Sequence, residues 1–181
     1  MMNYKIRVAT PDDAKIIHDI YGAYVKEEHV TFTIENPSVE NYKEKIIATL
    51  KKYPFYIAED NEGVVLGYVY GSPLRPHDAY KWNVESTIIL APEAPRRQGI
   101  ATALYSRFME SLKKQGYKHV YAVIVDINEA SIALHKALGF ETVGRFEDAG
   151  YKMGKWRGIV WMKKSLDESN GEPMEPMPFQ M

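Results

Sequence analysis

The chain has 181 residues, of which 45% are hydrophobic and 26% charged; its formal net charge is −1 and it has no cysteine. This length predicts one domain with a sizeable core, and the near-neutral charge argues against a nucleic-acid-binding protein held by bulk electrostatics. The missing cysteine excludes disulfides, thiolate metal sites and a cysteine acyl-enzyme. No apolar run approaches the roughly 20 residues of a membrane span, and no secretory segment follows Met1, so we expect a cytoplasmic protein with no membrane partner.

The first part of the chain predicts three strands and two helices. Residues 4–9 alternate like a strand, and Thr10 or Asp12 can cap the helix that follows. Residues 29–37 predict a loop, after which Ser38 can cap a second helix. Residues 55–59 and 64–71 predict a hairpin, and residues 72–81 an irregular segment.

The central stretch, residues 84–112, predicts a strand, a basic turn and an amphipathic helix. Residues 84–90 are apolar and β-branched apart from Glu85, as in a largely buried strand. Pro92 and Pro95 end this strand because neither can donate to a ladder. Apolar residues at a spacing of four then mark one face of the helix: Ile100, Leu104, Phe108 and Leu112.

The turn between this strand and this helix predicts an anion site. The first N–H groups of a helix have no internal partner and lie at the positive end of its dipole. Gly99 would let a phosphate approach this backbone, and Arg96 and Arg97 add positive charge. The turn matches neither the phosphate loop that ends in Gly-Lys-Ser/Thr nor the pattern Gly-x-Gly-x-x-Gly.

The last part predicts three strands and one short helix. Residues 119–125 predict a buried strand, and Asn128 and Ser131 stand at the start of a helix that Gly139 ends. Phe140 opens another strand, and residues 150–156 predict a loop before a last strand at 157–162. Residues 1–166 are thus predicted to form one domain with a mixed α/β sheet and helices on both faces. The tail, residues 167–181, is rich in proline and methionine and predicts an extended or disordered end.

Several of these patterns resemble a known family. Arg96, Gly99 and Ala101 fit the acyl-CoA signature Gln/Arg-x-x-Gly-x-Gly/Ala of the GNAT superfamily of N-acetyltransferases. Residues 79–87, 128–140 and 149–156 resemble its phosphinothricin and methionine sulfone/sulfoximine branch, in particular through Asn-x-x-Ser…Leu-His-x-x-x-Gly-Phe. The resemblance covers residues 6–162. The pair Glu28-His29 departs from it, because the branch has small hydroxyl residues there.

The resemblance implies an α/β fold of the GNAT type and an enzyme that moves an acetyl group from acetyl-CoA directly to the α-amine of a small amino-acid-like acceptor. It implies no metal, and relatives tend to be homodimers. Glu85 is the expected catalytic base, because a carboxylate in an apolar strand beside a cleft should have a raised pKa; a structural ion pair is the alternative. His135 stands where many relatives carry the tyrosine that protonates the departing sulfur, and its imidazole suits proton transfer. The alternative is a satisfied structural histidine.

The resemblance also implies how acetyl-CoA binds. Backbone N–H groups of residues 88–90, released by a strand bulge, would stabilise the oxyanion, and the same strand edge would pair with the pantetheine amides. Asn128 would hold the pantetheine arm, unless it is a plain helix-start residue. The predicted acetyl-CoA-binding residues are Ile88, Ile89, Leu90, Arg96, Arg97, Gln98, Gly99, Ile100, Ala101, Thr102, Asn128 and Ser131.

For the acceptor, Arg75 aligns with a basic residue of the relatives' pocket and can bind an α-carboxylate. The other residues predicted around the pocket are Phe32, Tyr80, Tyr105, Lys152 and Trp156, of which the aromatic ones are equally plausible as core. Two other functions stay open: a peptide or protein N-terminal acetyltransferase, and a non-catalytic acyl-CoA-binding module. Glu85 and His135 together argue against the binding module, and the long loop 72–81 argues for a closed pocket.

Overall fold

The computed structural model describes residues 3–27 and 30–180, which fold around one seven-stranded sheet. Its strand order is β1-β2-β3-β4-β5-β7-β6. Neighbours pair antiparallel except β4 and β5, which run parallel. The strands are β1 (Tyr4–Val8), β2 (Phe55–Asp60), β3 (Val65–Pro73), β4 (Asn83–Leu90), β5 (His119–Val125), β6 (Glu141–Lys152) and β7 (Lys155–Ser165).

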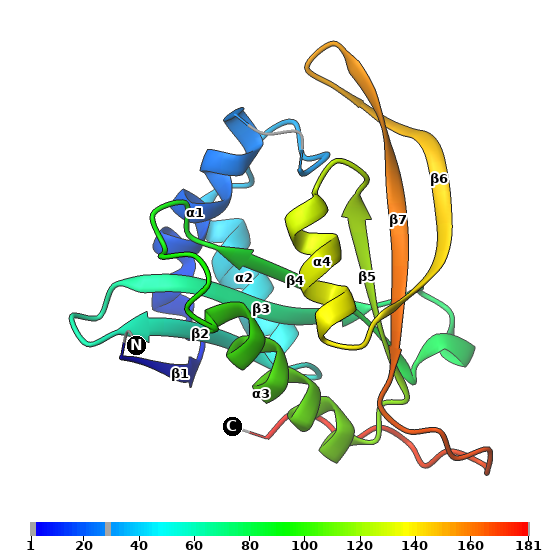
Figure 1. The fold of residues 1–181 in the computed structure, drawn as a ribbon. Coiled ribbons are helices and arrows are strands. Elements are labelled where there is room, and N and C mark those ends of the chain that lie inside the picture. Colours follow the sequence, from blue (N-terminus) through cyan, green and yellow to red (C-terminus); the bar gives the residue numbers. More distant parts are fainter. Residues whose placement is uncertain (1–2, 28–29, 181) are drawn as a thin grey trace.

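Helices cover both faces of this sheet, as predicted (Figure 1). The helices are α1 (Ala14–Glu27), α2 (Val39–Leu50), α3 (Ile100–Gln115) and α4 (Glu129–Ala137), with 3-10 turns η1 (Pro11–Asp13) and η2 (Asp78–Tyr80). On one face, α1 and α2 pack over Ile57 and Tyr68; on the other, α3 packs over Tyr56 and Val69. In the described residues no helix is long and apolar enough to cross a membrane.

The two parallel strands pair only at their beginnings. The β4–β5 ladder runs from Asn83, opposite His119, to Glu85, opposite Tyr121, and then stops. Beyond it the two strands diverge, β4 remaining with β3 while β5 follows β7 (Figure 1). Among residues 3–27 and 30–180, no strand therefore covers the edge of the second half of β4.

The prediction of a loop at residues 150–156 is wrong. Strand β6 continues to Lys152 and β7 begins at Lys155, so that only Met153 and Gly154 form the turn of a long hairpin. Their φ angles of 50° and 77° are those of a turn whose twist matches paired strands. Methionine is not a typical residue for such a position, which is why the sequence did not indicate the hairpin.

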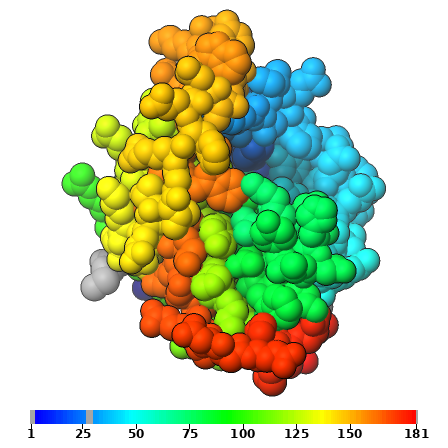
Figure 2. Space-filling model, turned by 90° about the vertical axis from the view of Figure 1, so that its right-hand side faces the viewer, coloured from blue at the N-terminus to red at the C-terminus, as the bar shows by residue number. Residues whose placement is uncertain are grey.

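The tail, residues 167–180, contains no helix or strand but is fastened to the domain. The backbone N–H of Met177 donates to the carbonyl of Gln115 (2.8 Å), and the Gln115 amide donates back to the carbonyl of Met177 (2.8 Å). The indole of Trp82 donates to the carbonyl of Met174 (2.8 Å). The tail, red in Figure 2, crosses below the segment that precedes β4. It connects the end of α3 with the start of β4 through these hydrogen bonds.

Candidate active site

Glu85 lies at the point where β4 and β5 separate. It pairs with Ser72 on one side and with Tyr121 on the other. Burial raises the pKa of its carboxyl above the ordinary 4.5, and the charge of Arg75 opposes this increase. Within the described residues its carboxylate accepts no hydrogen bond and has no salt bridge. The geometry thus provides a half-buried, unpaired carboxylate with a raised pKa, as the role of a proton acceptor requires.

Arg75 is held beside Glu85 by the irregular segment after β3. One guanidinium nitrogen donates to the carbonyl of Leu74 (2.8 Å), and the guanidinium carbon lies 4.9 Å from the centre of the Trp161 ring. A guanidinium that rests on an aromatic face keeps other N–H groups for a ligand. The structure therefore brings together a carboxylate and an arginine, Glu85 and Arg75, on the same face of the sheet.

The loop after α1 lies against the β6–β7 hairpin. Phe32 packs on Gly150: a Cβ added there would lie 2.7 Å from the Phe32 ring. The ammonium of Lys152 donates to the carbonyl of Thr31 (2.9 Å). Figure 2 shows this hairpin tip (orange) beside the segment of α1, its loop and α2 (blue). Loop and hairpin thus form a wall of the face that carries Glu85.

The other residues predicted to contact the acceptor differ in their exposure to solvent. Lys152 is only 5% exposed and fastens the loop, so a direct contact with the acceptor is not what its geometry favours. Tyr80 on η2 and Trp156 at the hairpin tip are exposed. Tyr105 is fully buried (0% exposed) among the core residues of α3, so its prediction as a pocket residue is wrong. Glu28 and His29, where the family resemblance breaks, lie outside the described residues.

His135 and Tyr105 form a buried polar chain on the opposite face of the sheet from Glu85. Side chains alternate along a strand, so Ser86 points toward α3 while Glu85 points away from it. The Tyr105 hydroxyl lies 2.7 Å from Nε2 of His135 and 3.0 Å from the hydroxyl of Ser86. Ser86 also donates to the carbonyl of Tyr121 (3.0 Å), beside the point where the β4–β5 ladder stops.

This arrangement gives His135 a different role from the expected one. Its side chain is 2% exposed, Nδ1 donates to the carbonyl of Ser131 (2.7 Å), and Nε2 faces Tyr105. Burial lowers the pKa of His135, and the bond to Ser131 opposes this. Neither ring nitrogen is free to touch a departing sulfur in this arrangement, which agrees with the alternative of a satisfied structural histidine.

The free edge of β4 is formed without the predicted bulge. The register with β3 runs unbroken from Pro73, opposite Val84, to Gly67, opposite Leu90. The N–H of Ala91 donates to the carbonyl of Leu66 on β3. Backbone N–H and C=O groups point to alternate sides along a strand, so those of Ile88 and Leu90 point away from β3, into the gap between β4 and β5.

The divergence of β5, rather than an extra residue, therefore exposes the N–H groups of Ile88 and Leu90. The N–H of Ile89 is not a free donor as predicted, because Ile89 pairs with Tyr68 and its backbone groups face β3. The carbonyl of Leu90 accepts from the Tyr24 hydroxyl (2.7 Å), a contact that the sequence did not indicate.

The basic turn has the geometry expected of an anion site. Gly99 precedes α3 with a φ of 79°, a conformation that favours glycine, and Arg97 has a φ of 59°. The turn is exposed from Arg96 to Gly99, and Ala101 is half-buried in the first turn of α3. This arrangement brings the residues predicted to bind pyrophosphate, from Arg96 to Thr102, together at one helix start.

Asn128 and Ser131 lie at the start of α4. The amide oxygen of Asn128 accepts from the N–H of Ser131 (3.1 Å), which makes Asn128 the N-cap of this helix. This is the alternative that the sequence had left open, and it occupies only the oxygen of the amide. In the described residues no group of three His, Cys, Asp or Glu side chains is arranged to hold a metal ion.

Comparison with known proteins agrees with this geometry. The profile of the acetyltransferase (GNAT) domain family matches residues 6–161. The chain is 34% identical to a phosphinothricin N-acetyltransferase of Streptomyces viridochromogenes, over 90% of this chain and 88% of the relative. It is 30% identical to an L-methionine sulfoximine/L-methionine sulfone acetyltransferase of Salmonella typhimurium, over 90% and 95%.

A solved structure has the same fold and a bound acyl donor. It is a phosphinothricin acetyltransferase of Sinorhizobium meliloti in complex with acetyl-CoA, with a TM-score of 0.90, 35% identity and coverage of 96% of this chain and 95% of that one.

Proposed function

The chain belongs to the GNAT acetyltransferase family, and from this premise we propose that it transfers the acetyl group of acetyl-CoA to the α-amine of a small amino-acid-like acceptor. The relatives named for phosphinothricin and for methionine sulfoximine and sulfone nominate the acceptor class. The observation that carries the proposal is the unpaired, half-buried carboxylate of Glu85 at the opening between β4 and β5.

The acetyl-CoA site proposed here has two parts. The residues from Arg96 to Thr102 would bind the pyrophosphate, because exposed helix-start N–H groups and arginines favour a dianion. The gap beside Ile88 and Leu90 would take the pantetheine arm, whose amides can pair with the free edge of β4. Asn128 keeps an amide N–H₂ group for the same arm.

The proposed chemistry uses the two sides of the sheet. Glu85 accepts a proton from the acceptor's ammonium group, and the resulting amine attacks the thioester carbonyl. A C–N bond forms as the C–S bond breaks, and the N–H of Ile88 or Leu90 donates to the carbonyl oxygen as it gains charge. The nitrogen then gives its second proton to the departing sulfur, so that a neutral amide remains and CoA leaves as a thiol. It leaves on the side of α3 and α4, where the chain Ser86–Tyr105–His135 lies.

Arg75 supports a free amino acid as the acceptor. Its guanidinium lies over Trp161 on the same face as Glu85, where it can hold an α-carboxylate while the neighbouring amine meets the base. A peptide N-terminus lacks this carboxylate. Acetylation of peptide or protein N-termini therefore remains the second candidate, and it needs a chain to pass the wall that Phe32 and the hairpin form.

A homodimer and a cytoplasmic location complete the proposal. Strand β6 lies at the end of the sheet order, and its outer edge carries exposed apolar side chains, among them Val143 and Phe146 (57% exposed). A long exposed edge with apolar residues is a template for pairing with another chain, and a second copy is the partner we propose. Light scattering of the purified protein checks the dimer, and cell fractionation checks the location.

The test of the function is the release of free thiol from acetyl-CoA with a panel of acceptors. We expect release with phosphinothricin, methionine sulfone or methionine sulfoximine, and little with their amides or with short peptides. Faster release with peptide N-termini would replace the proposal by the second candidate. No release with any amine, together with tight acetyl-CoA binding, would leave a binding module.

A further inference from the structure

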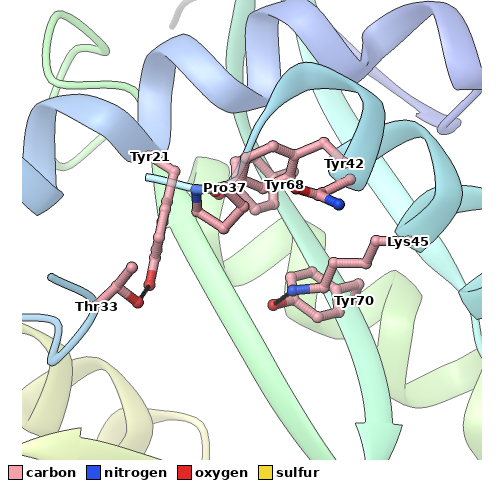
Figure 3. Close-up of a pocket in the computed structure, with 8 residues that line it drawn as sticks. Tyr21, Thr33, Pro37, Tyr42, Lys45, Tyr68 and Tyr70 are labelled. Atoms are coloured by element: carbon pink, nitrogen blue, oxygen red, sulfur yellow. Dashed lines mark hydrogen bonds between the residues drawn. The ribbon is translucent and has the colours of Figure 1, made fainter. Parts of the chain in front are cut away.

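A cavity of about 250 Å³ lies between α1, α2 and β3, on the face of the sheet that carries Glu85. Figure 3 shows its tyrosine walls: Tyr21 from α1, Tyr42 from α2, and Tyr68 from β3, with Lys45 of α2 beside Tyr70 of β3. From these residues we propose that the cavity binds the side chain of the acceptor and selects side chains that end in an oxygen-rich, negatively charged group. This inference rests on the proposed function and names its acceptor class.

The sheet register connects this cavity with the catalytic base. Ser72 pairs with Glu85, and Tyr70 pairs with Thr87, so Tyr70 is the neighbour of Ser72 on the same face of β3. A diagonal pair of this kind is separated by roughly 7–8 Å across two strands. An acceptor whose amine meets Glu85 can therefore extend its side chain along β3 toward Tyr70.

The cavity also shares a wall with the acceptor loop. Thr33 lines the cavity, and its hydroxyl lies 2.7 Å from that of Tyr21. Phe32, the preceding residue, packs against Gly150 of the hairpin. The same short segment thus borders the cavity on one side and the proposed acceptor site on the other.

The charge at the cavity comes from Lys45. Its ammonium lies 4.2 Å from the centre of the Tyr70 ring and donates to the Tyr70 hydroxyl, and in the described part of the chain it has no acidic partner. A cation without a counter-ion at the mouth of a cavity favours an anionic ligand and disfavours a cationic one.

An unpartnered hydroxyl adds a second polar group. The Tyr68 residue as a whole is 1% exposed. Among the described residues no hydrogen bond joins its hydroxyl to another protein group. Tyr68 lines the wall of the cavity, so its hydroxyl is available to a ligand there. A ligand oxygen in the cavity would accept a hydrogen bond from this hydroxyl. Carboxylate, phosphinate and sulfonate groups all combine such oxygens with the negative charge that Lys45 favours.

The experiment compares three acceptors that differ at the end of the side chain: phosphinothricin (anionic), methionine sulfone (neutral, with oxygens) and norleucine (apolar). We expect Lys45→Met to lower kcat/KM for phosphinothricin about 10-fold and to leave norleucine unchanged, since only the anionic group loses a charge-assisted contact. Lys43→Met, on the exposed surface of the same helix, is the matched control and should change nothing.

Tyr68→Phe tests the hydroxyl separately. It should lower kcat/KM for phosphinothricin and methionine sulfone but not for norleucine, without loss of thermal stability. An equal effect of Lys45→Met on all three acceptors, or none on phosphinothricin, would overturn the inference.

Calorimetric binding of phosphinothricin in the presence of CoA tests the side-chain site separately from the proposed acetyltransferase function. If no acceptor releases thiol, the function fails, while weaker binding to Lys45→Met than to Lys43→Met still supports the site and equal binding rejects it.

Discussion

The hydroxyl of Tyr105 lies 2.7 Å from Nε2 of His135, and both side chains are buried. Since Nδ1 of His135 donates to a carbonyl, a neutral ring can only accept at Nε2, so Tyr105 donates to it. Ser86 uses its single proton to donate to the carbonyl of Tyr121, so the contact between the hydroxyls of Ser86 and Tyr105 is left without a proton. If the ring were protonated, His135 could donate to Tyr105, Tyr105 to Ser86 and Ser86 to the carbonyl of Tyr121. Burial lowers the pKa of His135 and so opposes the protonated state.

His135→Ala is therefore expected to act on stability first. The substitution creates a cavity and leaves the Tyr105 hydroxyl without its partner, which should lower the free energy of unfolding by about 2–4 kcal/mol. Urea unfolding measures this loss, and the pH profile of turnover should keep its acid limb. A variant of normal stability whose profile loses a limb would instead make His135 a group that titrates in the reaction.

Glu85→Gln should remove the base and keep the shape of the site. Turnover is expected to fall by about 10²–10⁴-fold at neutral pH, while acetyl-CoA affinity stays within a few-fold of the wild type. Burial raises the pKa of Glu85, so the wild-type activity should fall with decreasing pH at a point above 4.5, and this limb should vanish in the variant. Glu62→Gln, in the exposed turn between β2 and β3, is the control. Near-normal turnover of Glu85→Gln would exclude Glu85 from the mechanism.

Ala101→Glu tests the phosphate site. A carboxylate in the first turn of α3 repels a pyrophosphate and fills the space beside it, so CoA affinity should fall by at least about 1–2 kcal/mol. Ala101→Gln separates bulk from charge, because only the charge effect should shrink with added salt. Unchanged affinity in both variants would place the phosphates elsewhere.

The periodic and chemical signals of the sequence predicted most of the fold. The helix faces, the hairpin at residues 60–63 and the strand that carries Glu85 follow from local patterns that tertiary packing reinforces. The hairpin at Met153-Gly154 was missed because its two positive φ angles depend on the pairing of β6 with β7, rather than on the turn residues themselves.

The site was predictable only as far as residue types carry the chemistry. Glu85 stands out as a carboxylate in an apolar strand, whereas the burial of Tyr105 depends on the packing of α3 over the sheet. The gap beside Leu90 results from the divergence of two strands far apart in the sequence. The contact of Lys45 with Tyr70 could not be predicted either, because in the sequence of α2 Lys45 resembles any exposed lysine, and only the fold places it beside Tyr70.

The ion pair of Arg7 and Asp13 links stability to pH. Two guanidinium nitrogens donate to the carboxylate (2.6 and 2.8 Å). Burial alone would raise the pKa of Asp13, but the bonds from Arg7 and Thr10 outweigh it, so the folded-state pKa lies below 3.8. The ion pair therefore stabilises the folded state fully above pH 3.8, and this stabilisation is lost as the pH falls through the lowered pKa of Asp13.

Arg7→Met should destabilise the protein by about 1–3 kcal/mol at neutral pH, because it removes the guanidinium from two buried carboxylates, Asp13 and Glu59. Asp13 then keeps only its bonds from Thr10. The difference in the free energy of unfolding between the variant and the wild type should become smaller well below pH 3.8, where Asp13 is protonated in both proteins. Urea unfolding at both pH values measures it. A difference that is independent of pH would mean that Arg7 acts through packing alone.

The specificity of Arg75 is the most direct measure of the acceptor class. If its guanidinium binds an α-carboxylate, the wild type should acetylate free amino acids while the matching amides are poor substrates. The amide lacks a charge-assisted pair worth roughly 1.5–3 kcal/mol, or about 10–100-fold in kcat/KM. Arg75→Ala should erase this preference and leave CoA affinity unchanged, because the proposed phosphate site is at the start of α3. Arg107→Ala, an exposed arginine on α3, serves as the control. Equal rates of the wild type on acid and amide would remove Arg75 from acceptor recognition, and the acceptor would then be oriented by its side chain alone.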